Sequence, residues 1–211
     1  MLIKTTRRLF RGTYQYKLVL ICAGASLFRS GDMDTTLKHL RSIRLDTQQK
    51  TGTSWRPALI KTQDELDYAF KLSAALSTMK ELDIRVESPW ISIYTNNKAD
   101  IDTLTGMSEA NVKYVSVPPD TGTLATDTII MPKMDFDYRV TLGKTNQEYS
   151  AFIDWAIANK KCKLTKSCIT ALEKHRSWGG THFYVTGDNN LLMARMHLNG
   201  SISKVERIIK A

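Results

Sequence analysis

Two periods of hydrophobic residues alternate along the chain, one typical of helices and one typical of strands. The clearest helix is predicted after residue 62, where apolar residues recur at steps of three and four: Leu66, Ala69, Leu72, Leu76 and Met79. Thr62 precedes Glu65 by three residues, which is the spacing of a capping box at a helix start. A second clear helix is predicted over residues 147–159. Weaker patterns predict helices over residues 35–43 and 98–107, and from Thr165 to about residue 175.

Alternating apolar and polar residues predict strands in much of the remaining chain. The expected strands cover residues 9–22, 84–95, 112–117, 128–131 and 136–142. Pro89 interrupts residues 84–95, which are therefore expected to form an edge strand, a bulge or a strand pair. Residues 45–58 are polar and contain one Gly and one Pro, which predicts a loop.

The C-terminal residues predict a three-stranded meander over residues 182–185, 191–198 and 201–209. Asn199-Gly200 is a typical type I′ turn and is expected to join the last two strands. This turn places Arg195 opposite Lys204 and directs alternate residues from Leu192 to Leu198 toward the core. The meander then presents a basic face to solvent, which makes it the first candidate for a binding surface.

The interleaved strands, helices and hairpins predict an α+β fold, with a mixed or antiparallel sheet and helices packed on one face. The favoured topology is a ferredoxin-like split βαβ unit followed by the C-terminal meander. The 211 residues are expected to form a single α+β domain, residues 1–211. Charge sub-divides it into a basic part at 1–62, an acidic middle at 63–143 and a basic part at 144–211, and no internal sequence repeat is evident.

Positive charge concentrates at the two ends of the chain. Residues 1–62 hold 12 Lys and Arg against 3 Asp and Glu, and residues 138–211 hold 12 against 5, whereas residues 63–137 hold 6 against 13. The apolar fraction of 42% excludes a disordered chain, and no apolar run reaches the ~18 residues of a membrane span. We expect the N- and C-terminal thirds to form one basic surface that binds a polyanion through its phosphates.

Nucleic acid is therefore the predicted partner, and RNA or single-stranded DNA is preferred because a basic sheet suits single strands better than a duplex. Three groups of cations are candidate phosphate contacts: Arg7, Arg8 and Arg11; Lys160, Lys161, Lys163, Lys166 and Arg176; and Arg195 with Lys204. The second group lies where two predicted helices meet before a hairpin, an order typical of a winged helix-turn-helix and also of an ordinary helical hairpin. The predicted basic sheet has few aromatic residues for base stacking, because Phe183 and Tyr184 point to opposite faces.

A metal-independent ribonuclease is the alternative function. Such cleavage needs a general base, a general acid and a cation beside the phosphate. His197, His182 and Lys204 lie within the predicted meander and are the residue types required. Nucleotide-binding, serine-hydrolase and zinc-protease motifs are absent, and the spacing of Cys162 and Cys168 is not that of a zinc pair, so no metal ion and no cofactor is expected.

A second alternative is a non-catalytic regulatory or structural module that binds a protein. Trp90, Tyr94 and Tyr114 are candidate anchors for such a partner, and the strand broken by Pro89 is a candidate edge for a homo-oligomer. Three cysteines are too few for a disulfide framework, which favours a cytoplasmic location. Basic residues before the apolar run at 18–25 have the order of a signal peptide, but alternation that begins before this run favours a strand.

Overall fold

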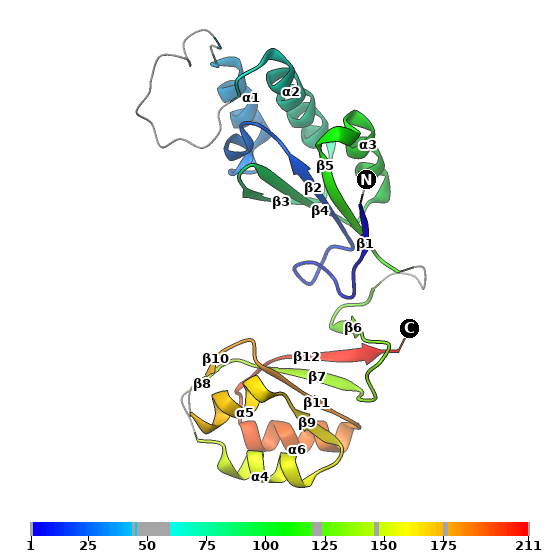
Figure 1. Ribbon diagram of the computed structural model, residues 1–211, viewed down its shortest axis with the longest axis vertical. Helices are drawn as coiled ribbons and strands as arrows, with labels where there is room; N and C mark the ends of the chain where they lie inside the picture. Colours follow the sequence, from blue (N-terminus) through cyan, green and yellow to red (C-terminus); the bar gives the residue numbers. More distant parts are fainter. Residues whose placement is uncertain are drawn as a thin grey trace. The chain divides into compact units, whose positions relative to one another are not determined.

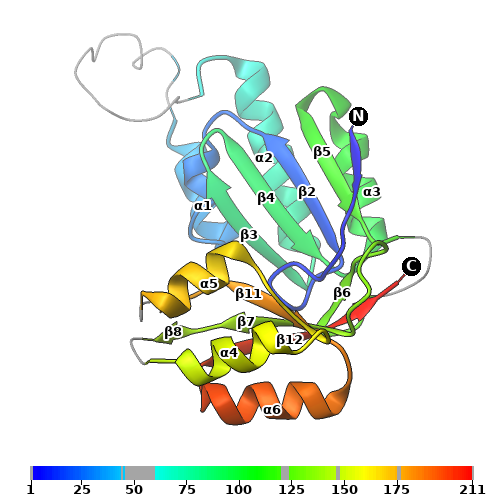
Figure 2. The same cartoon turned by 60° about the horizontal axis from the view of Figure 1, so that its bottom comes forward.

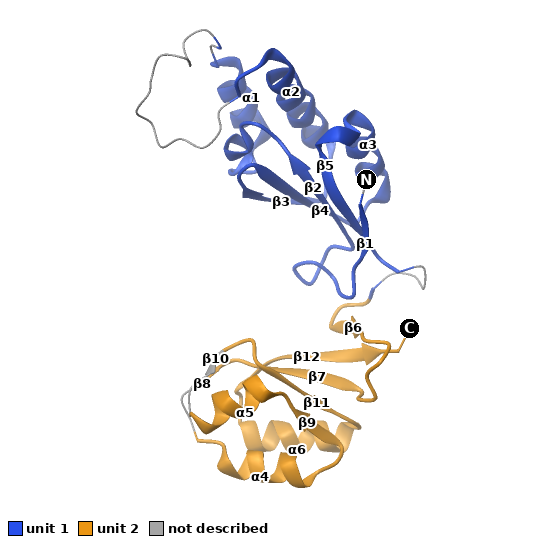
Figure 3. Cartoon of the chain, in the orientation of Figure 1, with its two compact units in different colours: residues 1–124 blue, residues 125–211 orange. Residues whose placement is uncertain are grey.

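The computed structural model describes residues 2–43, 45, 60–119, 124–145, 148–174 and 177–210. The chain folds as two compact units, residues 1–124 (unit 1) and residues 125–211 (unit 2), each with its own hydrophobic core (Figures 1 and 3). Both units are basic, with 17 Lys and Arg against 13 Asp and Glu in unit 1 and 13 against 8 in unit 2. The boundary between the units falls inside the segment expected to be the acidic middle.

Unit 1 is a five-stranded sheet with its α-helices on one face (Figure 2). Its strands are β1 (Ile3–Thr5), β2 (Tyr16–Ile21), β3 (Leu82–Glu87), β4 (Trp90–Thr95) and β5 (Val112–Val117), in the order β1-β5-β2-β4-β3. Its helices are η1 (Ala25–Phe28), α1 (Met33–Arg41), α2 (Gln63–Thr78), α3 (Lys98–Met107) and η3 (Glu109–Asn111). Strand β1 is parallel to β5, and the other neighbours are antiparallel.

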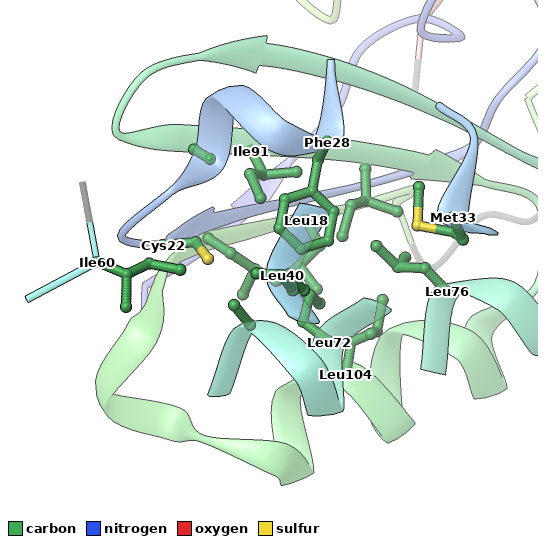
Figure 4. Packing of buried hydrophobic residues seen from close by; sticks show 14 of the residues in the cluster. Leu18, Cys22, Phe28, Met33, Leu40, Ile60, Leu72, Leu76, Ile91 and Leu104 are labelled. Carbon is green, nitrogen blue, oxygen red and sulfur yellow. The ribbon is translucent and has the colours of Figure 1, made fainter. Parts of the chain in front are cut away.

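The core of unit 1 lies between this sheet and the helices (Figure 4). Strand β2 contributes Leu18 and Leu20, which are fully buried because every second residue of the strand faces the helices. The capping box at the start of α2 is confirmed, since the Thr62 hydroxyl accepts a hydrogen bond from Glu65 N–H and the Glu65 carboxylate accepts one from Thr62 N–H, each at 3.2 Å. The apolar stripe on α2 then packs onto the sheet, as its period predicts.

Unit 2 is a second five-stranded sheet, in the order β6-β12-β7-β11-β9. These strands are β6 (Thr128–Ile130), β7 (Tyr138–Leu142), β9 (Cys162–Leu164), β11 (His182–Val185) and β12 (Ile202–Ile209). The helices are α4 (Ser150–Ala158), α5 (Lys166–Glu173) and α6 (Asp188–Leu198), and a small antiparallel pair joins β8 (Lys144–Thr145) to β10 (Ser177–Trp178). Phe183 of β11 and Phe152 of α4 are fully buried at the centre of this core, with ring centroids 5.2 Å apart.

The two units have the same strand topology. In both, an edge strand (β1 or β6) lies parallel to the last strand of the unit (β5 or β12), which is antiparallel to the next strand (β2 or β7). The remaining two strands follow in the same order and are again antiparallel to their neighbours. The α+β fold with helices on one face of the sheet is therefore confirmed for each unit. The ferredoxin-like assignment stays a prediction, because each unit adds a parallel edge strand to the split βαβ order.

The predicted C-terminal meander is wrong in its middle strand, because residues 188–198 form helix α6. Leu191, Ala194 and Leu198 are buried at steps of three and four, and Asn199 ends the helix in the left-handed region at φ 34°. Gly200 follows at φ 83°. A type I′ turn and a left-handed helix end both require positive φ, so Asn-Gly fits both, and tertiary packing selects the helix.

The first long strand also begins later than expected. The strand expected at 9–22 begins only at β2, because Arg11 and Gly12 adopt positive φ values of 52° and 74° in a turn closed by a bridge between Phe10 and Tyr14. Residues 82–95 form the strand pair β3–β4, which turns at Pro89 and is one of the arrangements expected for residues 84–95. Residues 46–58 of the expected loop lie outside the described part of the chain. Among the described residues, no helix has the length and apolar character needed to cross a bilayer.

Candidate nucleic-acid interface

The face of the unit 1 sheet opposite its helices, here called the open face of unit 1, carries a set of aromatic and basic side chains. Since Leu18 and Leu20 of β2 point to the helices, Lys17 and Val19 point to the open face. Lys17 lies directly across from Tyr94 of β4 on one side and Ser116 of β5 on the other. The register therefore places a lysine between two central strands, beside an aromatic ring.

Lysine ammonium groups lie over two tyrosine rings of this face. Lys17 Nζ is 5.5 Å from the ring centroid of Tyr94 and 5.6 Å from that of Tyr114. Lys4, from edge strand β1, places its Nζ 4.0 Å from the Tyr114 centroid. These separations are within the range of cation–π attraction, so the rings hold the cations close to the sheet surface.

A third lysine, paired with another ring, extends the set along β4 and β5. Lys113 Nζ lies 3.4 Å from the ring centroid of Trp90, whose side chain keeps 39% of its surface exposed. Trp90 is opposite Ile21 of β2, another exposed apolar residue at 42%. The open face therefore presents apolar surface in contact with solvent next to a lysine.

The turn before β2 closes one end of the open face. Phe10 and Tyr14 pack against Tyr94, with ring centroids 5.8 Å and 6.3 Å away, and Tyr94 is only 6% exposed. Arg11 projects from this turn over the Tyr94 ring, 4.9 Å from its centroid, and forms an ion pair with Asp83 of β3. The buried ring of Tyr94 therefore serves only to hold the cations, whereas the rings of Trp90 and the half-buried Tyr114 keep surface that a ligand can reach.

Charge is unevenly distributed across the open face. Asp83 and Glu87 lie on edge strand β3, and there they form ion pairs with Arg11 and Arg85. The lysines lie toward the other edge, on β2, β5 and β1. This combination of lysines with rings fits a single strand, because aromatic faces stack on bases while ammonium groups contact phosphates.

Unit 2 also has an open face, opposite its helices, and a buried carboxylate lies at its centre. Glu206 of β12 is 1% exposed, and its two oxygens accept hydrogen bonds from Arg139 Nη1 at 3.2 Å and from Lys204 Nζ at 3.0 Å. Arg139 Nη2 lies 3.3 Å from Nδ1 of His182. Burial, and after it the charge of Arg139, lower the pKa of His182 below its ordinary value of 6.5, which favours the neutral ring.

The structure brings together two of the three residues expected for catalysis. His182 and Lys204 both lie opposite Thr141 of β7, one on each side, so they share the open face of unit 2. His197 belongs to α6 on the other side of the sheet, where its ring centroid lies 5.4 Å from that of Trp155. The expected position of His197 in a strand of the meander is therefore wrong.

The predicted pairing of Arg195 with Lys204 across a hairpin is also wrong, because Arg195 is an exposed residue of α6. The two residues nevertheless line one open pocket of about 560 Å³ at the edge of β12, together with Asp127. Lys204 Nζ is 3.8 Å from the Asp127 carboxylate. Helix α6 places Arg195 beside this pocket, and strand β12 places Lys204 there.

The second group of predicted cations is divided by strand β9, which replaces the expected turn between two helices. The helix-turn-helix and helical-hairpin interpretations are therefore both wrong. Lys163 lies on the open face of unit 2, directly opposite Tyr184 of β11. Lys160 and Lys161 are exposed just before the strand, Lys166 starts α5 after the Thr165 N-cap, and Arg176 lies outside the described residues.

The first group of predicted cations lies between β1 and β2. Arg7 and Arg8 are exposed, and Arg11 belongs to the open face of unit 1. The cations missed by the sequence reasoning are Lys4, Lys17 and Lys113. Trp90 and Tyr114 were recognised as candidate anchors, but for a protein partner. A lysine near the start of each of the otherwise largely apolar strands β2 and β5 is the signal that indicates such a face, once the neighbouring strands are known.

Among the residues that the structure describes, no group of three or more His, Cys, Asp or Glu side chains is placed to hold a metal ion. No family model matches the chain, and neither a curated protein nor a solved structure matches it. The geometry of the two open faces therefore carries the functional argument.

Proposed function

We propose that the protein binds single-stranded nucleic acid, RNA or DNA, on the open face of unit 1. The observation that carries the proposal is the contact of Lys4, Lys17 and Lys113 with Tyr114 and Trp90. Stacked bases and a negatively charged backbone need both kinds of group side by side. A flat sheet face accommodates unpaired bases, whereas it does not enter the grooves of a duplex.

A polyanion fits this face better than a protein partner with an apolar surface. Lysines held over the rings would have to be desolvated beneath such a partner without gaining a counter-charge. A phosphate backbone supplies that counter-charge, and a base can replace the ammonium on the ring. The rings of Trp90 and Tyr114 are thus expected to stack with bases, while Lys4, Lys17 and Lys113 move to phosphates.

Fluorescence anisotropy with a labelled oligonucleotide of about 12 nucleotides tests the proposal across a salt series. The double variant Lys17→Gln/Lys113→Gln should lower the slope of log K against log salt by about 1.4, because each phosphate contact on a single strand contributes about 0.7. The matched control is Lys71→Gln/Lys80→Gln, which removes the same charge from exposed positions outside the open face. Equal slopes for the two double variants would contradict the proposal.

Base stacking has a separate test in Trp90. Trp90→Ala should weaken binding by about 1–3 kcal/mol, whereas Trp90→Phe, which keeps a ring, should retain most of the affinity. Since Trp90 is 39% exposed, neither change removes a core residue. An equal loss in both variants would indicate that stacking plays no part. A duplex of the same length should bind more weakly than the single strand.

A second candidate function, metal-independent RNA cleavage, rests on the shared network of His182 and Lys204. The base would take the proton of a 2′-hydroxyl, whose oxygen attacks phosphorus. The 5′-oxygen would leave with a proton from the acid, which produces a 2′,3′-cyclic phosphate and a 5′-hydroxyl. His182 is assigned the base and Lys204 the acid. Cleavage of RNA in EDTA that disappears in His182→Ala is the expected result, and cleavage that persists in this variant contradicts the assignment.

A further inference from the structure

The shared topology of the two units places equivalent rows of side chains on their open faces. In unit 1, Tyr94 of the third strand of the split βαβ order lies opposite Lys17 of the first. In unit 2, Tyr184 and Arg139 occupy the same two strands and are again directly opposite each other. Each unit therefore places a cation of its first strand beside an aromatic ring of its third strand, on the face without helices.

The two faces differ in what they leave exposed. Tyr184 is 7% exposed and is covered by Phe136, whose ring centroid is 6.0 Å away, so it offers no surface to a base. Two exposed side chains of this face are cationic: Lys163, which lies next to Tyr184, and Lys204, with 40% of its side-chain surface exposed. The face of unit 2 is therefore suited to phosphate rather than to bases.

Glu206 holds the two central cations of this face in place. Each of its oxygens engages one cation, so Arg139 and Lys204 are kept next to each other on the sheet. A guanidinium has five N–H donors, and the contacts to Glu206 and His182 use two of them. Lys163 lies on β9, and β11 separates that strand from β7 with Arg139. The three cations face two carboxylates, Glu206 and, 3.8 Å from Lys204 Nζ, Asp127, so the face keeps a net positive charge.

We propose that the open face of unit 2 binds the phosphate backbone of a nucleic-acid strand through Arg139, Lys163 and Lys204, and that Glu206 is the positioning residue of this site. The proposal extends the proposed function by adding a second surface, one that does not depend on bases. Charge-assisted hydrogen bonds from a guanidinium and two ammonium groups are the usual recognition of a phosphodiester.

An oligomer of about 12 abasic deoxyribose phosphates separates phosphate contacts from base stacking, because it offers phosphates without bases. The full chain should bind this probe, and Lys163→Gln/Lys204→Gln should weaken binding about tenfold and lower the salt slope by about 1.4. The matched control Lys144→Gln/Lys174→Gln removes two exposed lysines of unit 2 other than the three proposed contacts. Trp90→Ala should leave the affinity for the abasic probe unchanged.

Equal binding of the abasic probe by these two double variants would overturn the site in unit 2. Weaker binding of an unmodified strand by Trp90→Ala would, in that case, still support base stacking on unit 1. Weaker binding of the abasic probe by Lys163→Gln/Lys204→Gln, together with unchanged binding of an unmodified strand by Trp90→Ala, would support the site in unit 2 and refute stacking in unit 1.

Glu206→Gln tests the positioning role of Glu206. The substitution raises the net charge of the protein by one, so charge alone would predict tighter binding. Weaker binding of the abasic probe, by about fivefold, is expected if Glu206 orients the cations. Tighter binding would show that only charge matters and would overturn its assigned role.

Discussion

Helix α6 decides which C-terminal residues reach the open face of unit 2, and alanine substitutions along it test its presence. In the helix, Leu198 is fully buried and Leu192 is 57% exposed. In the strand that the alternation predicts, both residues would face the core. Leu198→Ala and Leu192→Ala should therefore have very different effects if the helix is present, and similar effects if a strand is present.

The magnitudes follow from burial. Removing a fully buried leucine side chain costs roughly 3–5 kcal/mol, since it loses the transfer free energy and leaves a cavity. Leu192→Ala should change the free energy of unfolding by less than about 0.5 kcal/mol, because the residue is exposed and alanine favours helix. A second pair of substitutions should show the same contrast. Leu191→Ala should destabilise the chain strongly and Met196→Ala only slightly, because the two residues are 8% and 67% exposed.

Urea unfolding followed by far-UV circular dichroism measures the difference. With a denaturant dependence of about 1–3 kcal/mol per M, Leu198→Ala should lower the midpoint by about 1 M or more, and Leu192→Ala should leave it almost unchanged. Comparable losses for Leu192→Ala and Leu198→Ala would refute the helix, and with it the separation of His197 from His182.

Three further predictions concern a helix cap, the thiols and pH. Thr62→Ala should destabilise the chain by about 1 kcal/mol through loss of the capping box, whereas Thr62→Ser should keep the cap, as thermal unfolding of the two variants would show. Burial raises the pKa of Cys22, Cys162 and Cys168 to about 12, so iodoacetamide at about pH 8 should leave the folded chain unmodified and label it in denaturant; labelling of the folded chain would contradict their burial. The pKa of His182 is lowered in the folded state, so the unfolded chain binds more protons, and stability is present above pH 6.5 and lost as pH falls below it. His182→Gln should flatten the unfolding free energy between about pH 7 and pH 5, and an unchanged profile would contradict the shift.

Local patterns were sufficient wherever one face of an element is buried and its ends carry a specific signal. Helix α2 combines a stripe at steps of three and four with a capping box, and α3 and β5 were predicted with the bounds that the structure shows. These elements have one hydrophobic period each, so the sequence leaves no competing interpretation. The α+β class followed from their alternation along the chain.

Patterns compatible with two structures were decided only by tertiary packing. Residues 191–198 contain apolar residues at both the strand period and the helix period, and Asn199-Gly200 suits a hairpin turn and a helix end equally. The unit 2 core selects the helix, because Leu191, Ala194 and Leu198 fill it together. The short strand β9 carries too few residues to show a period at all.

The sequence by itself determined the type of those elements that carry a single hydrophobic period, the basic charge and the residue classes suited to a phosphate-rich partner. Only the tertiary structure decided which residues share a face, because strand order and register bring together positions far apart in the chain. Lys4, Lys17 and Tyr114 come from three strands and meet only through the pairing of β1 and β2 with β5. Glu206 and Arg139 meet in the same way, since no local pattern encodes a pairing between residues 67 positions apart.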